Sequence, residues 1–292
     1  FILIALTWIY LVYSEVPAVA GILYGIKPAV TAIVLFAAYR IGSRALKNHM
    51  LRAISVVAFM AIFAFNTPFP YIVLIAGLIG YVGSYVMPDQ FQASGHHGSA
   101  KNTYGPALID DDTPAPEHAR FLWSRLIVFT VIGLLIWGSV MVLLAMHYGW
   151  EGTLTQMGWF FTKAALLTFG GAYAVLPYIY QGAVGFYEWL TPAQMIDGLA
   201  LGEATPGPLI MVVAFVGFIG GYVNALFGPD MLFLAGAVAA TLVVWFTFLP
   251  SFIFILAGGP LVESTHGNLK FTAPLTAISA AVVGVILNLA MF

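Results

Sequence analysis

Two interrupted apolar segments hold the residues whose types and spacing could do chemistry, FGG at 169–171 and PGP at 206–208. No continuous helix runs through PGP, because proline lacks an amide hydrogen and disfavours helical dihedrals at the residue before it. The chain must unwind there and restart, with Pro208 suited to the first turn of the new helix. A helix start presents unpaired N–H groups and the positive end of the helix dipole, so this break predicts a binding site for an anion.

The first segment has a similar character. We expect Gly170-Gly171 and then Pro177 to break an otherwise long helix. Inside a membrane, broken backbone is tolerated only where it is buried in protein or lines a wet cavity. A single break can serve packing alone, and that alternative stays open. Two breaks in one half of the chain, one of them beside an acid, favour a site.

The acid is Glu203, three residues before Pro206 in an apolar setting. An ionised carboxylate is costly there and would repel a bound anion, whereas the protonated acid would tolerate one. We therefore expect Glu203 to be the coupling or gating acid. The alternative is that it caps a helix or pairs locally, with Lys163 or with an unwound amide.

Two lysines lie within apolar segments. Lys163 precedes Gly170 by seven residues, two turns of a continuous helix, and is expected to face the substrate path. Snorkelling of its side chain to an interface is the alternative. Lys27 lies beside Pro28, and an intramembrane cation is rarely without function. The candidate substrate-binding residues are Lys27, Lys163, Phe169, Gly170, Gly171, Glu203, Thr205, Pro206, Gly207 and Pro208.

Composition shows which elements must position these residues. The 292 residues are 61% hydrophobic and only 8% charged, whereas soluble domains carry about 25% charged residues. Apolar runs long enough to cross a membrane as helices recur almost end to end. The expected fold is all-α, a polytopic helical membrane protein with broken helices. The predicted spans are 1–13, 17–40, 51–66, 68–87, 124–148, 158–182, a broken pair within 192–226, 231–257 and 272–292.

Three ranges organise the chain: 1–87, a polar linker at 88–122, and 123–292. The loop after the second span holds four cations and no acid, which places it in the cytoplasm by the positive-inside rule and assigns its cations to topology. A hairpin turning at Asn66-Thr67-Pro68 returns the linker to the same side. These cations are Arg40, Arg44, Lys47 and Arg52.

Residues 26–38 and 278–290 match weakly, as in a protein built from two repeated halves. Apolar helices also match by chance, so this pattern alone leaves a true repeat open. Paired halves are a common plan of transporters, with the substrate site near the midplane between them.

Several other functions find no support in the sequence. A net charge of -2 gives no basic field for nucleic acid, and the chain has no cysteine for disulfides or thiol catalysis. No glycine is followed directly by lysine, so there is no phosphate-binding loop for ATP. His96, His97 and His118 lack an ordered ligand spacing. We expect no metal site and no cofactor.

FGGAYAVLPY at 169–178 and GLALGEATPGPLIMVVAFVGFIGG at 198–221 closely resemble the signature of the C-terminal half of chromate transporters. GILYGIKPAVTAIVLFAAYR at 21–40 resembles the last helix of that family's N-terminal half, and AAVVGVILNLA at 280–290 extends the resemblance. The family's N-terminal glycine-rich and Pro-Gly-Pro motifs have no counterpart here, and the chain opens within a hydrophobic run. We therefore expect a long, two-half transporter truncated at its N-terminus.

The resemblance implies export of chromate, with sulfate as a related or competing oxyanion, across the cytoplasmic (inner) membrane of a bacterium or archaeon. A dianion leaving an inside-negative cell gains about 4.6 kcal/mol per 100 mV, so the membrane potential could drive export, with or without a proton. An ungated anion channel and an intramembrane enzyme using Asp197 and Glu203 are the alternatives, although six residues put these two acids on different helix faces. The sequence leaves open whether two chains pair as a homodimer.

Overall fold

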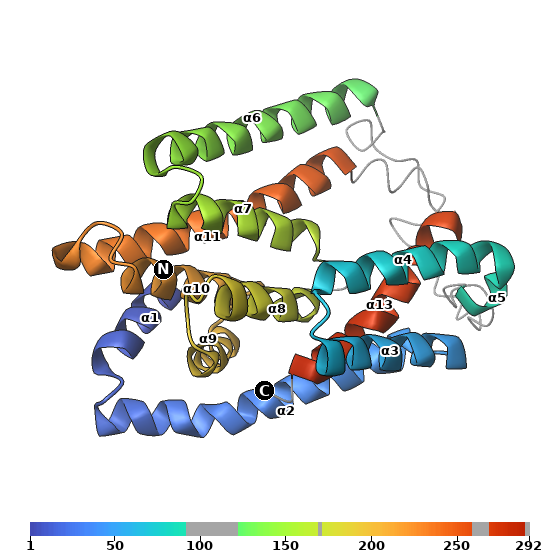
Figure 1. Cartoon of the computed structure of the whole chain (residues 1–292), viewed down its shortest axis with the longest axis horizontal. Coiled ribbons are helices and arrows are strands. Elements are labelled where there is room, and N and C mark those ends of the chain that lie inside the picture. Colours follow the sequence, from blue (N-terminus) through green and yellow to red (C-terminus); the bar gives the residue numbers. More distant parts are fainter. Residues whose placement is uncertain (92–121, 169–170, 259–268, 290–292) are drawn as a thin grey trace, which may run out of the picture.

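The structure is a computed structural model that describes residues 1–91, 122–168, 171–258 and 269–289. Within these ranges every regular element is helical (Figure 1). The first group of helices is α1 (Ile2–Tyr13), α2 (Pro17–Ala45), α3 (His49–Phe65), α4 (Phe69–Val86) and the short α5 (Pro88–Phe91). The second group is α6 (Trp123–Tyr148), α7 (Thr153–Leu166), α8 (Ala172–Tyr180), α9 (Pro192–Ala204), α10 (Val212–Val223), α11 (Leu232–Ile253) and α13 (Leu269–Leu289).

Four short helical segments continue or precede these helices, among them the π-helices Gln181–Phe186 and Phe254–Gly258 and the 3₁₀ turn Leu209–Met211. The π-helices follow α8 and α11 directly. The 3₁₀ turn leads into α10. A fourth turn, Pro229–Met231, leads into α11 in the same way.

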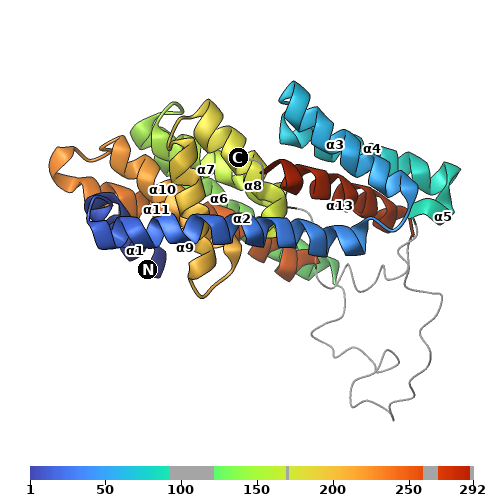
Figure 2. The ribbon, with the colours of Figure 1, turned by 90° about the horizontal axis from the view of Figure 1, so that it is seen from below.

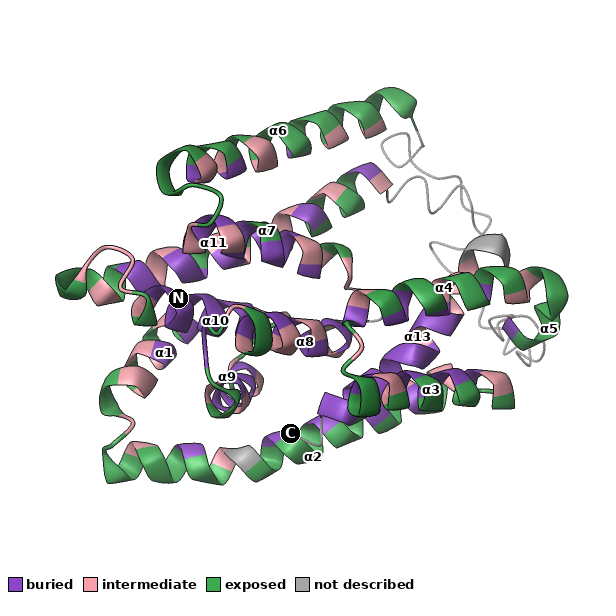
Figure 3. Cartoon of the chain, in the orientation of Figure 1, coloured by how far each residue is buried: buried purple, intermediate pink, exposed green. Residues whose placement is uncertain are grey.

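Within the described part of the chain, five helical spans are long and apolar enough to cross a membrane: Pro17–Ala45, Phe69–Val86, Trp123–Tyr148, Pro229–Gly258 and Thr272–Leu289. Much of α2 and α6 is exposed, whereas α10 and α13 are largely buried (Figure 3). Apolar helix faces that are exposed along most of a helix are stable in contact with lipid, whereas contact with water would be unfavourable. The chain is a multi-pass helical membrane protein, as its composition predicts.

Helix α13 is the centre of one end of the molecule and packs against α2, α3, α4 and α8. Small residues let the backbones approach closely: a Cβ on Gly80 of α4 would lie 2.6 Å from the backbone oxygen of Ala273 in α13. At the other end α10 packs along α11. Figure 2 shows α2 running along the molecule, where it contacts both α9 and α13.

Helices occupy the predicted spans to within about five residues, and five of them are confirmed as long and apolar enough to cross a membrane. The turn at Asn66 is confirmed, with the backbone in the left-handed conformation at φ 47°. One predicted break is wrong. Pro177 lies inside α8, and the backbone continues as helix through Tyr180 into the π-helix Gln181–Phe186. The start of the predicted linker is also ordered, because α5 buries Phe91 against Gly83. The three linker histidines, His96, His97 and His118, lie outside the described residues.

Candidate functional site

The first break separates α7, which ends at Leu166, from α8, which begins at Ala172. Gly171 caps α8 with φ +112°, a conformation that side-chain-bearing residues rarely adopt. A break at the glycines is therefore confirmed. Phe169 and Gly170 lie outside the described residues, so their part in the site stays a prediction.

The second break follows α9, whose last residue is Ala204. Thr205 is extended, its hydroxyl donates to the backbone oxygen of Gly202 at 2.9 Å, and Pro206, Gly207 and Pro208 are exposed. The chain re-enters helix at Leu209 through a 3₁₀ turn capped by Pro208, and α10 starts at Val212. The predicted unwinding and restart are confirmed, with Pro208 one position before the first turn.

A tyrosine joins the two breaks. Tyr173, two residues after Gly171, donates a hydrogen bond from its hydroxyl to Oε1 of Glu203 in α9. The acid beside the second break is therefore held by the helix that starts at the first break. Sequence reasoning missed Tyr173, although a polar side chain in the first turn after a glycine break was a signal that could have found it.

The helical spacing that related Lys163 to Gly170 is not realised, so the facing of Lys163 toward a substrate path stays a prediction. Helix α7 ends at Leu166, so no continuous helical face runs from Lys163 to Gly170. The ammonium lies 5.8 Å from the centroid of the Trp159 ring, a cation–π arrangement within one helix. The alternative in which Glu203 pairs with Lys163 is wrong, because the hydrogen-bond partner of this acid is Tyr173. Lys27 belongs to α2, and its side chain lies outside the described part of the structure.

Asp197 is the second acid of α9 and is held at a different place. Its side chain is 6% exposed, and the hydroxyl of Tyr10 in α1 donates to its Oδ2 at 3.0 Å. Asp197 and Glu203 thus bond to tyrosines of different helices, α1 and α8. The two carboxylates do not face a common point, as their spacing predicts.

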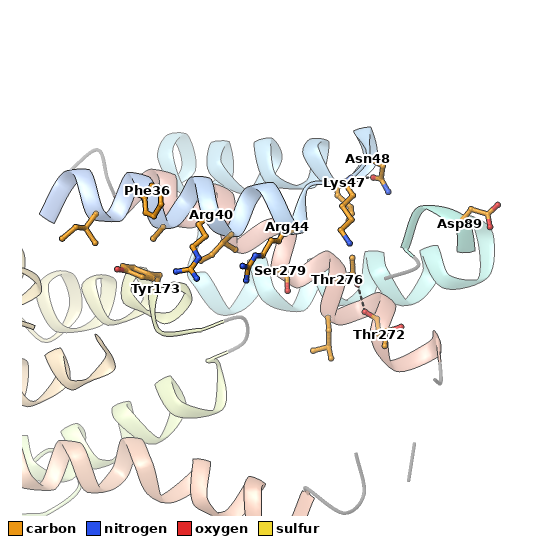
Figure 4. Close-up of a pocket in the computed structure, with 16 residues that line it drawn as sticks. Phe36, Arg40, Arg44, Lys47, Asn48, Asp89, Tyr173, Thr272, Thr276 and Ser279 are labelled. Carbon is orange, nitrogen blue, oxygen red and sulfur yellow. Dashed lines mark hydrogen bonds between the residues drawn. The ribbon is translucent and has the colours of Figure 1, made fainter. Parts of the chain in front are cut away.

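Tyr173 also lines an open cavity of about 1020 Å³. Its walls come from five helices, α2, α3, α5, α8 and α13, and from the short segment between α2 and α3. Figure 4 shows Arg40 directed toward Tyr173, Arg44 toward Ser279, and Lys47 toward Thr276. Arg40 and Arg44 are four residues apart on α2, so they share a helix face.

From the sequence, these cations are predicted only to determine the orientation of the protein in the membrane. The i, i+4 spacing of Arg40 and Arg44 was the signal that they point the same way. Only the packing of α13 and α8 beside α2 shows that this direction leads into a cavity. Arg52 behaves differently: it lies on α3, its Nε donates to the backbone oxygen of Leu46 at 3.5 Å, and it does not line the cavity.

Comparison with known proteins gives a consistent result. A sequence profile described as chromate transporter matches residues 1–81 and 155–292. A chromate transport protein of Pseudomonas aeruginosa is 32% identical over 286 residues, which cover 98% of this chain and 58% of that protein. A chromate transport protein of Cupriavidus metallidurans is 24% identical over 285 residues, covering 97% of this chain and 58% of that protein.

The chain thus spans less than two thirds of the length of these two relatives. No solved structure matches it. The family profile covers α1 to α4 and α7 to α13, which include both breaks, Tyr173, Glu203 and the three cations of the cavity. This chain belongs to the chromate transporter family.

Proposed function

We propose that this protein is a secondary transporter that exports a divalent tetrahedral oxyanion, chromate first and sulfate as the related candidate, across the cytoplasmic membrane. The observation that carries the proposal is the Tyr173–Glu203 hydrogen bond, which brings two interrupted helices of a chromate transporter family member together beside a cation-lined cavity. The names of the two relatives support chromate as the substrate.

The two breaks supply what a desolvated anion needs. The backbone at Gly171 and at Pro206 to Pro208 lies outside regular helix, and the helices that follow begin with amides that have no intrahelical acceptor. These donors and the positive ends of the two helix dipoles replace water around the anion. Without such fixed donors, an unpaired charge in a low-dielectric interior would cost far more than the membrane potential supplies.

In this mechanism, the protonation state of Glu203 controls the binding and release of the anion. When protonated, the carboxyl accepts from Tyr173 and tolerates an anion nearby. When ionised, it repels the anion and promotes its release, so that protonation and anion movement are linked. The free energy for export comes from the membrane potential, about 4.6 kcal/mol per 100 mV for a dianion.

An intramembrane enzyme finds less support. The two acids of α9 are bonded to tyrosines of different helices, so they are not placed as an acid and base around one substrate. A passive anion channel would need no coupling acid. Transport against a gradient distinguishes a transporter from that channel.

The test uses the full-length protein in inside-out membrane vesicles with labelled chromate. Gly171→Leu places a side chain at φ +112°, and Pro208→Leu lets the second break close into helix; each variant should abolish accumulation while leaving membrane insertion intact. Gly138→Leu is the matched control, because a Cβ at Gly138 of α6 meets nothing within 4 Å. Accumulation at the unmodified rate in both break variants would contradict the proposal.

A further inference from the structure

The cavity beside Tyr173 is lined by side chains that can bind a ligand. One wall carries three cations in series, Arg40 and Arg44 from α2 and Lys47 from the segment after it. The opposite wall is α13, which presents the hydroxyls of Thr276 and Ser279 (Figure 4). Charged donors therefore face neutral hydroxyl groups across one open space.

Among the described residues that line this cavity, three are cations and Asp89 is the one acid, which lies at the far end near Asn48 in Figure 4. Glu203 is bonded to Tyr173. Like charges held together on one wall repel one another, so a bound anion is the arrangement that stabilises them.

The donor set also defines the kind of anion. A guanidinium presents a planar fork of N–H groups that matches two oxygens of a tetrahedral oxyanion, and an ammonium adds a point charge. Thr276 donates its own hydroxyl to the backbone oxygen of Thr272 at 2.9 Å, which fixes the side chain at the wall. A volume of about 1020 Å³ admits a small oxyanion together with part of its hydration shell.

We propose that the cavity lined by Arg40, Arg44 and Lys47 is a capture site for a free, divalent tetrahedral oxyanion, separate from the two breaks and connected to them through Tyr173. The inference rests on the proposed function, because it takes the cargo of that function as the ligand. Tyr173 stands between the two places: its ring lines the cavity, and its hydroxyl holds Glu203 beside the second break. A captured anion meets this tyrosine before it reaches the broken helices.

The phosphate of a lipid headgroup has the same chemistry as a free oxyanion. Ile33, Phe36 and Leu275 give the cavity an apolar rim that could also hold an acyl chain. The experiment therefore has two arms. One measures sulfate binding in nanodiscs of phosphatidylcholine alone, and the other repeats it with phosphatidylglycerol added.

The probe is radiolabelled sulfate, bound at equilibrium to the purified full-length protein. Arg40→Gln and Arg44→Gln should each raise the Kd for sulfate about tenfold, because each removes one charge-assisted contact. Arg44→Lys should restore part of the loss, since it keeps the charge without the fork. Arg52→Gln is the matched control: it removes the same charge from the neighbouring helix end without touching the cavity, and should leave the Kd within about twofold.

Transport provides a second readout. Arg40→Gln and Arg44→Gln should raise the KM for the oxyanion on the cytoplasmic side and leave the maximal rate nearly unchanged, as expected for a step that precedes translocation. An unchanged Kd in both arginine variants would overturn the inference. So would equal weakening by Arg52→Gln, or sulfate binding that phosphatidylglycerol abolishes competitively, because the occupant would then be a lipid headgroup.

The inference and the proposed function fail in different ways. In the Gly171→Leu protein, the part of sulfate binding that Arg40→Gln and Arg44→Gln weaken should persist although transport is lost. Sulfate binding that depends on Arg40 and Arg44 in a protein that transports no oxyanion would refute the function and keep the site. Transport by a protein whose binding ignores both arginines would refute the site and keep the function.

Discussion

At the scale of single residues, the Tyr173–Glu203 hydrogen bond is the contact that links the breaks. The two residues are 30 positions apart and belong to different helices. Each side chain is partly buried, so neither is fully hydrated. The ionisation of a carboxyl group held in this way depends both on the proton concentration and on whether an anion is bound nearby.

Replacing Glu203 with glutamine tests that role. Glutamine keeps the size and the hydrogen-bond acceptor for Tyr173 but stays neutral at every pH. We expect Glu203→Gln to bind the oxyanion and to transport it with a rate that no longer shows the pH dependence contributed by this acid, because glutamine cannot exchange a proton. Initial rates of chromate uptake into inside-out vesicles at several pH values provide the measurement.

Glu15→Gln is the control, because Glu15 lies exposed in the turn between α1 and α2. This variant should keep the pH profile of the unmodified protein. A Glu203→Gln protein with that same profile would show that the acid is structural.

At the scale of elements, close helix contacts at glycine hold α13 in place. A Cβ on Gly284 of α13 would clash with the backbone oxygen of Ser55 in α3, and a backbone atom cannot move aside as a flexible side chain can. Ser55 is itself buried at 4% exposure. The α3–α13 pair therefore depends on the absence of one methyl group.

We expect Gly284→Ala to destabilise the protein by about 1–3 kcal/mol, the usual cost of overpacking a buried contact. Thermal unfolding of the detergent-solubilised protein, followed by loss of monodispersity, provides the measurement. Gly138→Ala in α6 is the control. Its new methyl group meets nothing within 4 Å, and alanine favours helix over glycine by about 1 kcal/mol, so this variant should be neutral or slightly more stable. Equal melting temperatures for the two variants would contradict the close α3–α13 contact.

At the scale of the whole molecule, the cation-rich loop after α2 predicts the orientation of the protein in the membrane. With that loop in the cytoplasm, the α3–α4 hairpin should enter the membrane and return to the cytoplasmic side, and α6 should then cross the membrane once. α6 has 26 residues, enough to span about 39 Å at the rise of an α-helix. The loop between α6 and α7 should then face the opposite side.

The chain contains no cysteine, so a single introduced thiol reports its own position. Ser43→Cys, at the end of α2, should react with a membrane-impermeant maleimide only in inside-out vesicles. Glu151→Cys, in the loop after α6, should react only in intact cells, and both native side chains are exposed. Labelling of both positions from the same side would refute the proposed orientation.

The sequence by itself determined the class of the protein, its helices and its two breaks. These are local properties: a run of apolar residues fixes a span, and glycine or proline interrupts it through dihedral preferences and missing donors that act over one helical turn. The prediction failed at Pro177, because helix α8 continues past this proline into a π-helix. A proline can kink a helix without ending it, and the residue pattern around Pro177 does not distinguish these two outcomes.

Tertiary structure decided which side chains meet. It bonded Glu203 to Tyr173 rather than to Lys163, separated Asp197 from Glu203, and turned Arg40 and Arg44 from topology signals into the wall of a cavity. Each of these outcomes depends on how α2, α8, α9 and α13 pack, and α2 and α13 lie far from the other two along the chain. Packing is set by the fit of whole helix faces, in which a single glycine such as Gly284 decides how near two backbones come, and that fit cannot be read from the spacing of residues within one helix.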